Sequence, residues 1–155
     1  NLNIINLFFS YIFNWGDFNE FDTILLFDIL EHGDDLKILK EAKRVARRRI
    51  LAVVPRKVDP SLEQSGVIFR HYLDKSHLRE YQEVDIKKLA RKMGLKLVNL
   101  KKVHPLYNET IFLSLFGGPL LLRKIIRKIS FFILPKIHYP TEYFAVFEKW
   151  VRLLV

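Results

Sequence analysis

Apolar runs and segments of helical periodicity alternate along the first third of the chain. Residues 23–27 (TILLF) form an apolar run between two aspartates, which is typical of a strand buried on both faces of a parallel sheet. Apolar residues then recur at helical spacing over 34–47. A second apolar run, ILAVV at 50–54, follows that helix. The order strand, helix, strand predicts a βαβ unit.

The rest of the chain continues this alternation. Residues 56–76 form a long polar connection, and a connection of that length inside a compact domain is usually functional. The remaining pattern predicts a helix at 83–93 ended by Gly94, a strand at 95–103, a helix at 120–134 and a strand at 143–150. The predicted fold class is therefore α/β, with a sheet of about four strands and flanking helices.

Composition narrows the class of protein. The chain has 155 residues, half of them apolar, which suits one domain with a packed core. The absence of cysteine excludes a disulfide scaffold, a thiolate zinc site and a cysteine nucleophile. No apolar run reaches the roughly 20 residues of a membrane-spanning helix, and the first 16 residues lack the basic flank of a secretory signal. We therefore expect a cytoplasmic protein.

Charge is distributed unevenly along the chain. The formal net charge is +9, yet residues 1–36 contain seven acids and no Lys or Arg. Nine basic residues cluster at 37–57, where no aromatic residues are interleaved with them. Nucleic-acid binding is therefore not expected, because no stacking platform accompanies these charges. The split indicates an acidic working edge beside a basic exterior.

The predicted helix at 120–134 is amphipathic and basic. Its Lys and Arg residues share one face, and Leu, Ile and Phe share the other. This arrangement is typical of a helix that lies on an anionic membrane surface, which would make the protein a peripheral membrane protein. A cap helix packed on the domain with a solvated basic face shows the same pattern.

The end of the first predicted strand carries the chain's most concentrated candidate chemistry. Asp28, Glu31 and His32 follow the strand directly, and open α/β sheets bind ligands at the carboxyl ends of their strands. Glu31 and His32 are suited to general acid–base work, and Asp28 to accepting hydrogen bonds from a ligand. The alternative is that both acids cap the next helix and that His32 is a surface residue.

Several motifs occur in a specific order. They are FDTILLFDILEH (21–32), EAKRV (41–45), ILAVVP (50–55), HLREY (77–81) and MGL (93–95). Together they resemble class I S-adenosylmethionine-dependent methyltransferases, and more narrowly the branch that modifies small molecules. The similarity covers about residues 21–103, with weaker agreement at 143–150.

The resemblance implies a partial Rossmann-like sheet. Its four strands resemble the fourth to seventh of the methyltransferase sheet, with the last inserted antiparallel between the fifth and sixth. Residues 117–135 would be an insertion. The family's glycine-rich cofactor loop has no counterpart, so the expectation is a single truncated domain over 1–155, in which 1–20 are a strand remnant or unrelated sequence. The exposed edge of such a sheet favours self-association.

The resemblance also assigns the cofactor site. The family's cofactor is S-adenosylmethionine, and the segment after the first predicted strand lines its pocket. By position, the cofactor-binding residues here are Phe27, Asp28, Ile29 and Leu30. The expected activity is methyl transfer to a small-molecule acceptor. The alternative functions are an inactive methyltransferase remnant and a membrane-associated binding protein.

Four residues are expected on the acceptor side of this site. His32 is the preferred base because the pKa of an imidazole lies near working pH, and Glu31 lies beside it. His77 and Tyr81 are substrate-side candidates. Some relatives hold a divalent metal with an acid-x-x-Glu-His sequence at this place, and Asp28, Glu31 and His32 have the residue types for Mg²⁺ or Mn²⁺.

Overall fold

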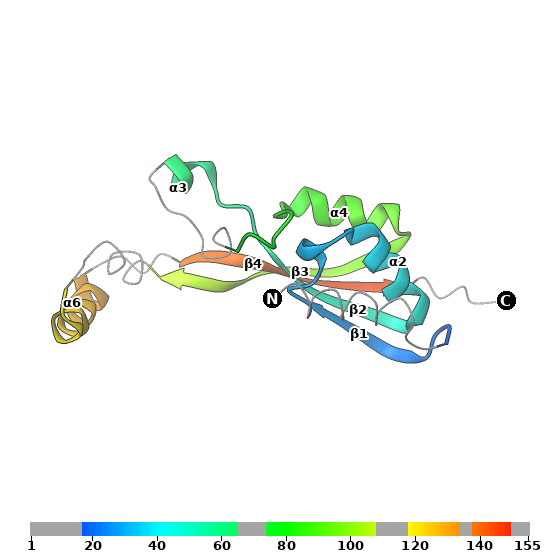
Figure 1. Cartoon of the computed structure of the whole chain (residues 1–155), viewed down its shortest axis with the longest axis horizontal. Helices are drawn as coiled ribbons and strands as arrows, with labels where there is room; N and C mark the ends of the chain where they lie inside the picture. The colour runs from blue at the N-terminus through cyan, green and yellow to red at the C-terminus, as the bar shows by residue number, and fades with distance from the viewer. Residues whose placement is uncertain (1–16, 65–73, 108–117, 134–137, 150–155) are drawn as a thin grey trace.

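A computed structural model of the chain describes residues 17–64, 74–107, 118–133 and 138–149 (Figure 1). It is a mixed α/β structure, as predicted. The described elements are β1 (Phe21–Phe27), the 3₁₀ helix η1 (Leu30–His32), α2 (Asp35–Val45), β2 (Ala46–Pro55), α3 (Pro60–Gln64), α4 (Glu83–Lys92), β3 (Leu95–Tyr107), α6 (Leu120–Ile133) and β4 (His138–Lys149).

The four described strands form one sheet in the order β1-β2-β4-β3. β1 and β2 precede and follow α2 in the sequence and pair with each other in parallel, so the predicted βαβ unit is confirmed. β4 is antiparallel to both of its neighbours, which confirms the expected insertion of the last strand. β1 occupies one edge of this sheet. Self-association at that edge stays a prediction.

Helices α2 and α4 lie over the same face of the sheet (Figure 1). The core between these helices and the sheet contains Ile38 and Ile86 from the helices and Ala52 and Phe147 from the strands, all at most 2% exposed. The prediction that the first strand is buried on both faces is wrong. In β1, Leu26 is buried, whereas Leu25 is 56% exposed and Phe27 is 47% exposed, so only the side chain that points toward the helices is covered.

β2 begins four residues earlier than the apolar run predicts. Its first half contains three consecutive arginines, which the sequence pattern does not identify as strand. Partners in the neighbouring strands explain this start, because Arg47 bonds Asp22 of β1 at 3.1 Å and Arg49 bonds Glu148 of β4 at 2.9 Å. Cross-strand pairs of opposite charge stabilise a sheet at such positions.

The last two strands are also longer than predicted. Beyond the final pair of β2 with β4, β3 and β4 continue alone as a two-stranded arm over 104–107 and 138–141. Pro105 and Pro140 lie opposite each other in this arm, although Pro140 was expected to lie between elements. An arm has two open edges, where the missing N–H of proline removes no ladder bond.

Local signals at the helix ends agree with the structure. The Asp34 side chain accepts a hydrogen bond from the Lys37 backbone N–H at 3.1 Å and so caps α2. Gly94 follows α4 with φ of 56°, the left-handed conformation expected at a helix end. The connection at 56–76 differs from its prediction, since it contains the short helix α3, and residues 65–73 lie outside the described part.

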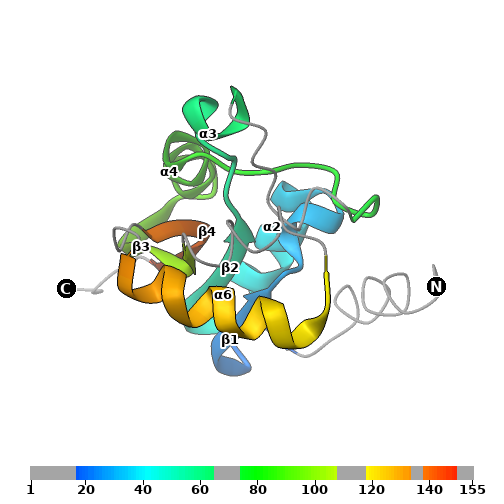
Figure 2. The same cartoon turned by 90° about the vertical axis from the view of Figure 1, so that its left-hand side faces the viewer.

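Helix α6 lies at one end of the molecule, beyond the arm (Figures 1 and 2). Its apolar residues stay largely exposed, so within the described structure α6 is not the cap helix packed on the domain that the sequence also allowed. No described helix combines the length and apolar character needed to cross a bilayer.

Candidate functional site

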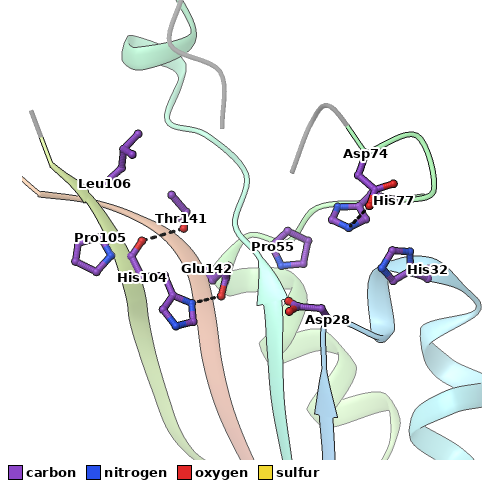
Figure 3. A pocket seen from close by; sticks show the side chains of 10 residues that line it. All are labelled: Asp28, His32, Pro55, Asp74, His77, His104, Pro105, Leu106, Thr141 and Glu142. Atoms are coloured by element: carbon purple, nitrogen blue, oxygen red, sulfur yellow. Dashed lines mark hydrogen bonds and ion pairs between the residues drawn. The ribbon is translucent and has the colours of Figure 1, made fainter. Parts of the chain in front are cut away.

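A pocket of about 560 Å³ opens at the carboxyl ends of β1 and β2 (Figure 3). Three parts of the fold surround it. They are the ends of the parallel strands, η1 together with the loop before α4, and the β3–β4 arm. The lining residues are Asp28, His32, Pro55, Asp74, His77, His104, Pro105, Leu106, Thr141 and Glu142. Among these described residues are three carboxylates and three imidazoles but no Lys or Arg. This lining favours a cationic ligand.

Asp28 is the first residue after β1 and has a φ of 52°. Its backbone N–H still donates to the Val53 carbonyl at 3.1 Å, so the backbone leaves the sheet abruptly at this residue. Aspartate is one of the few residues besides glycine that adopt this left-handed conformation readily. The turn leaves the Asp28 side chain exposed at the pocket.

Glu31 lies behind the pocket wall in η1 and is completely buried. Within the described part of the chain, neither of its carboxylate oxygens meets a hydrogen-bond partner from another residue. Burial, followed by the negative charges of Asp28, Glu142 and Asp74, raises the pKa of Glu31 from 4.5 to about 7. Burying two carboxylate oxygens without hydrogen-bond donors is energetically unfavourable. Such a group is commonly found where a ligand or ion binds.

Two histidines face this carboxylate. The Nε2 atoms of His32 and His77 each lie 4.0 Å from Glu31 Oε1, and the two rings meet edge to face with centroids 4.6 Å apart. Burial, followed by the nearby His32, lowers the pKa of His77. The three residues therefore form one cluster, with the carboxylate buried inside. The two imidazoles line the pocket (Figure 3).

Hydrogen bonds fix the orientation of His32. Its Nδ1 lies 3.3 Å from the Ser76 carbonyl oxygen and 3.1 Å from Ser76 Oγ, which itself donates to Asp74 at 2.6 Å. Because a carbonyl only accepts, the imidazole hydrogen belongs on Nδ1. The lone pair of Nε2 then points toward Glu31. An imidazole held in this way is ready to accept a proton or to bind a cation.

The loop before α4 reaches the site because it pairs with the end of β2. The Tyr81 N–H donates to the Pro55 carbonyl at 2.9 Å, and the Lys57 N–H donates to the Tyr81 carbonyl at 3.0 Å. Closer to the cluster, the Leu78 N–H donates to the Glu31 carbonyl at 2.8 Å. These bonds bring His77 next to residues that precede it by some 45 positions.

Tyr81 was predicted beside His77, but the structure places it elsewhere. Its ring is 2% exposed and lies in the core, and its hydroxyl donates to Asp35 at 3.3 Å. Burial and the Asp35 charge raise the pKa of Tyr81, so the hydroxyl stays protonated. Asp35 is held in turn by Arg79 at 2.8 Å. Tyr81 therefore anchors the loop to the core and does not line the pocket.

The predicted cofactor segment is divided between surface and core. Of its four residues only Asp28 lines the pocket. Leu30 is 1% exposed and belongs to the core, Ile29 is partly buried against it, and Phe27 is exposed outside the lining. The reason is the chain reversal at Asp28, which turns the following residues beneath the strand end and leaves one carboxylate at the opening.

Sequence reasoning missed the residues that close the other side of the pocket. Asp74, His104, Thr141 and Glu142 all line it, and His104 Nδ1 pairs with the Glu142 carboxylate (Figure 3). His104 and Glu142 lie 38 positions apart and meet only because β3 pairs with β4. The only local signal was the length of polar chain at 56–76, which contains Asp74.

Glu31, His32 and His77 also have the composition of a cation site. One ligand atom from each lies within 4.8 Å of the others, and one carboxylate with two imidazoles suits a divalent transition metal. The cluster differs from the predicted set, because His77 takes the place of Asp28. The unpartnered oxygens of Glu31 and the hydrogen bond that holds His32 to Ser76 both fit such an ion.

Comparison with known proteins gives a match in structure only. No protein-family model and no curated protein matches the sequence. An S-adenosylmethionine-dependent methyltransferase from Archaeoglobus fulgidus matches with a TM-score of 0.57 at 13% identity, over 90% of this chain and 64% of that one. The YcgJ protein from Bacillus subtilis matches with a TM-score of 0.50 at 18% identity, over 86% of this chain and 66% of that one.

These similarities establish the fold. The described sheet and its helices have the arrangement found in S-adenosylmethionine-dependent methyltransferases. The chain spans less than two thirds of the length of either solved structure.

Proposed function

We propose that this chain forms part of a methyltransferase that uses S-adenosylmethionine to methylate a small-molecule acceptor. One observation carries the proposal: in a fold shared with a methyltransferase, the turn after β1 presents Asp28 to a pocket that His32 and His77 also line, with Glu31 buried behind the two imidazoles. Strand ends of this kind are where open α/β sheets bind their ligands. The proposal includes the branch of small-molecule enzymes that the motifs resemble.

The charges of the pocket support the cofactor assignment. S-adenosylmethionine carries a sulfonium and an ammonium group, and both are cationic. Asp28, Asp74 and Glu142 line the pocket without any Lys or Arg among the described lining residues. Asp28 is the best placed of the three to hold the ammonium or hydroxyl groups of the cofactor, because it directly follows the parallel strand.

The reaction asks little of the protein beyond alignment. The sulfonium methyl group is already electrophilic, so the chain must orient the acceptor and, where the acceptor carries a proton, remove it. His32 is the candidate base, since it lines the pocket and Ser76 fixes its ring by holding the Nδ1 hydrogen. His77 lies beside it, at the opening of the same cluster.

As an alternative to the His32 base, because one Nε2 lone pair cannot serve both roles, we propose that Glu31, His32 and His77 hold a divalent transition-metal ion, for which Mn²⁺ is the probe. A bound cation would supply positive charge to bind and orient an acceptor oxygen. The chain contributes a carboxylate that no other described side chain bonds and an imidazole whose tautomer is set by Ser76.

Cofactor binding tests the main proposal. Titration calorimetry with S-adenosylmethionine is expected to give a measurable binding heat, and Asp28→Asn is expected to weaken the affinity at least tenfold. Asparagine tolerates the same left-handed backbone, so this variant removes the charge and keeps the conformation. Glu63→Gln, on exposed α3, is the matched control and should bind like the wild type. Absence of binding, or unchanged affinity in Asp28→Asn, would contradict the proposal.

Cation binding is tested separately by thermal unfolding. Mn²⁺ at 100 times its Kd is expected to stabilise the chain by about 2.7 kcal/mol, since only the folded state brings the three ligands together. His77→Gln should abolish most of this shift, and His104→Gln, a pocket histidine outside the cluster, should retain it. An equal shift in all three proteins would mean that the cation binds elsewhere.

A further inference from the structure

Helix α6 exposes an unusually large apolar surface. Leu121 is 72% exposed and Phe132 is 84% exposed, and Ile125 and Ile129 between them are each about half exposed. These residues recur at three- and four-residue spacing and so share one side of the helix. The full set of exposed apolar side chains on α6 is Leu120, Leu121, Leu122, Ile125, Ile129, Phe131, Phe132 and Ile133.

The side of α6 next to this strip is predominantly basic, although Leu120 and Phe131 lie among its cations. Arg123, Lys124, Arg127 and Lys128 are all exposed and lie together on the helical wheel, with Lys128 bordering the apolar strip. No acidic residue occurs anywhere from 110 to 141 in the sequence, so no neighbour along the chain neutralises these charges. The segment combines an exposed apolar strip with local charge of one sign.

The position of α6 leaves this surface accessible. The helix lies past the end of the β3–β4 arm and away from the layer formed by α2, α4 and the sheet (Figure 1). Among its described residues only Ser130 is buried. The apolar strip is therefore largely uncovered by the described part of the chain.

We propose that α6 docks this protein on membranes that contain anionic lipids. The helix would lie in the plane of the interface, with its apolar strip among the acyl chains and its cations among the lipid headgroups. Its 14 residues rise about 21 Å along the helix axis, less than the roughly 30 Å of a hydrocarbon core, which fits an interfacial and not a spanning position.

Charge selects the lipid surface over a second copy of the chain. Two α6 helices packed through their apolar strips would leave eight basic side chains, four from each copy, around a short apolar contact with no anion to pair with them. An anionic bilayer instead satisfies both sides of the helix at once. The proposal concerns a surface far from the pocket and does not depend on the methyltransferase function.

Vesicle flotation of the full chain tests this docking. The probes are neutral phosphatidylcholine vesicles and vesicles with 30% phosphatidylglycerol, about that fraction being enough to give a strong negative surface potential. The chain is expected to float with the anionic vesicles at low salt, at least tenfold more than with neutral ones, and to dissociate partly at high salt.

Two variants separate the contributions of the helix. Phe132→Ser should reduce flotation more than tenfold by removing an apolar anchor, and Arg127→Gln combined with Lys128→Gln should reduce it similarly by removing charge. Leu25→Ser, an exposed apolar residue of β1 at 56% exposure, is the matched control and should float like the wild type. Unchanged flotation in the α6 variants, no flotation at all, or an α6-dependent dimer in sedimentation without vesicle binding would overturn the proposal.

Discussion

Replacing Phe147 with alanine is expected to lower the free energy of unfolding by about 3–5 kcal/mol, the usual cost of removing a buried phenylalanine ring. Phe147 is 1% exposed and lies in β4 directly between Ile50 of β2 and Leu97 of β3. Its ring therefore fills the centre of the core, at the strand whose insertion completes the sheet. Urea denaturation followed by circular dichroism measures the loss.

Phe132→Ala is the matched control for this experiment. It deletes the same side chain from α6, where 84% of the residue is exposed, and should change the stability by less than about 0.5 kcal/mol. A loss below about 1 kcal/mol in Phe147→Ala would show that β4 does not sit between β2 and β3 in this register.

Glu31→Gln is expected to stabilise the chain, and to do so more at high pH. The folded pKa of Glu31 is about 7, against 4.5 for an unperturbed glutamate. Its contribution to stability is therefore fully present below pH 4.5 and is lost as pH rises through 7, because folding then requires an ionised carboxylate without a partner. The glutamine side chain of the variant cannot ionise, so the gain over wild type should be roughly 2–3 kcal/mol larger at pH 8 than at pH 5.

This comparison is made by urea denaturation at both pH values with a chelator present, so that no cation occupies the cluster. The contributions of the other titrating groups to the pH dependence cancel in the difference, because variant and wild type share those groups. Glu63→Gln, which replaces an exposed glutamate, should follow the wild type at both pH values. Parallel stability profiles for Glu31→Gln and wild type would mean that folding does not raise the pKa of Glu31.

The first half of the fold was predictable because its signals are local. The apolar runs of β1 and β2, the cap at Asp34 and the stop at Gly94 each depend on a few neighbouring residues, and all appear in the structure. The antiparallel insertion of β4 came from the family resemblance. Strand bounds were less predictable, because Arg47 and Arg49 belong to β2 through charged partners on other strands.

The site was predictable only where its residues are adjacent in sequence. Glu31 and His32 directly follow a strand and were identified as a pair, and the resemblance added His77. His104 and Glu142 could not be found in this way, since the register of two distant strands brings them to the pocket. Tyr81 shows the opposite case. Its position near His77 in the sequence suggested a pocket residue, but its backbone pairs with Arg56 at the end of β2 and its ring lies in the core.

The left-handed backbone at Asp28 has a consequence for how this position can vary during evolution. Asparagine and glycine meet the conformational requirement as well as aspartate does, whereas a β-branched residue would be strained. Only aspartate also provides negative charge. Homologues that interchange all three residues would reveal a position kept for the shape of the turn, and homologues restricted to aspartate would reveal selection for the carboxylate itself.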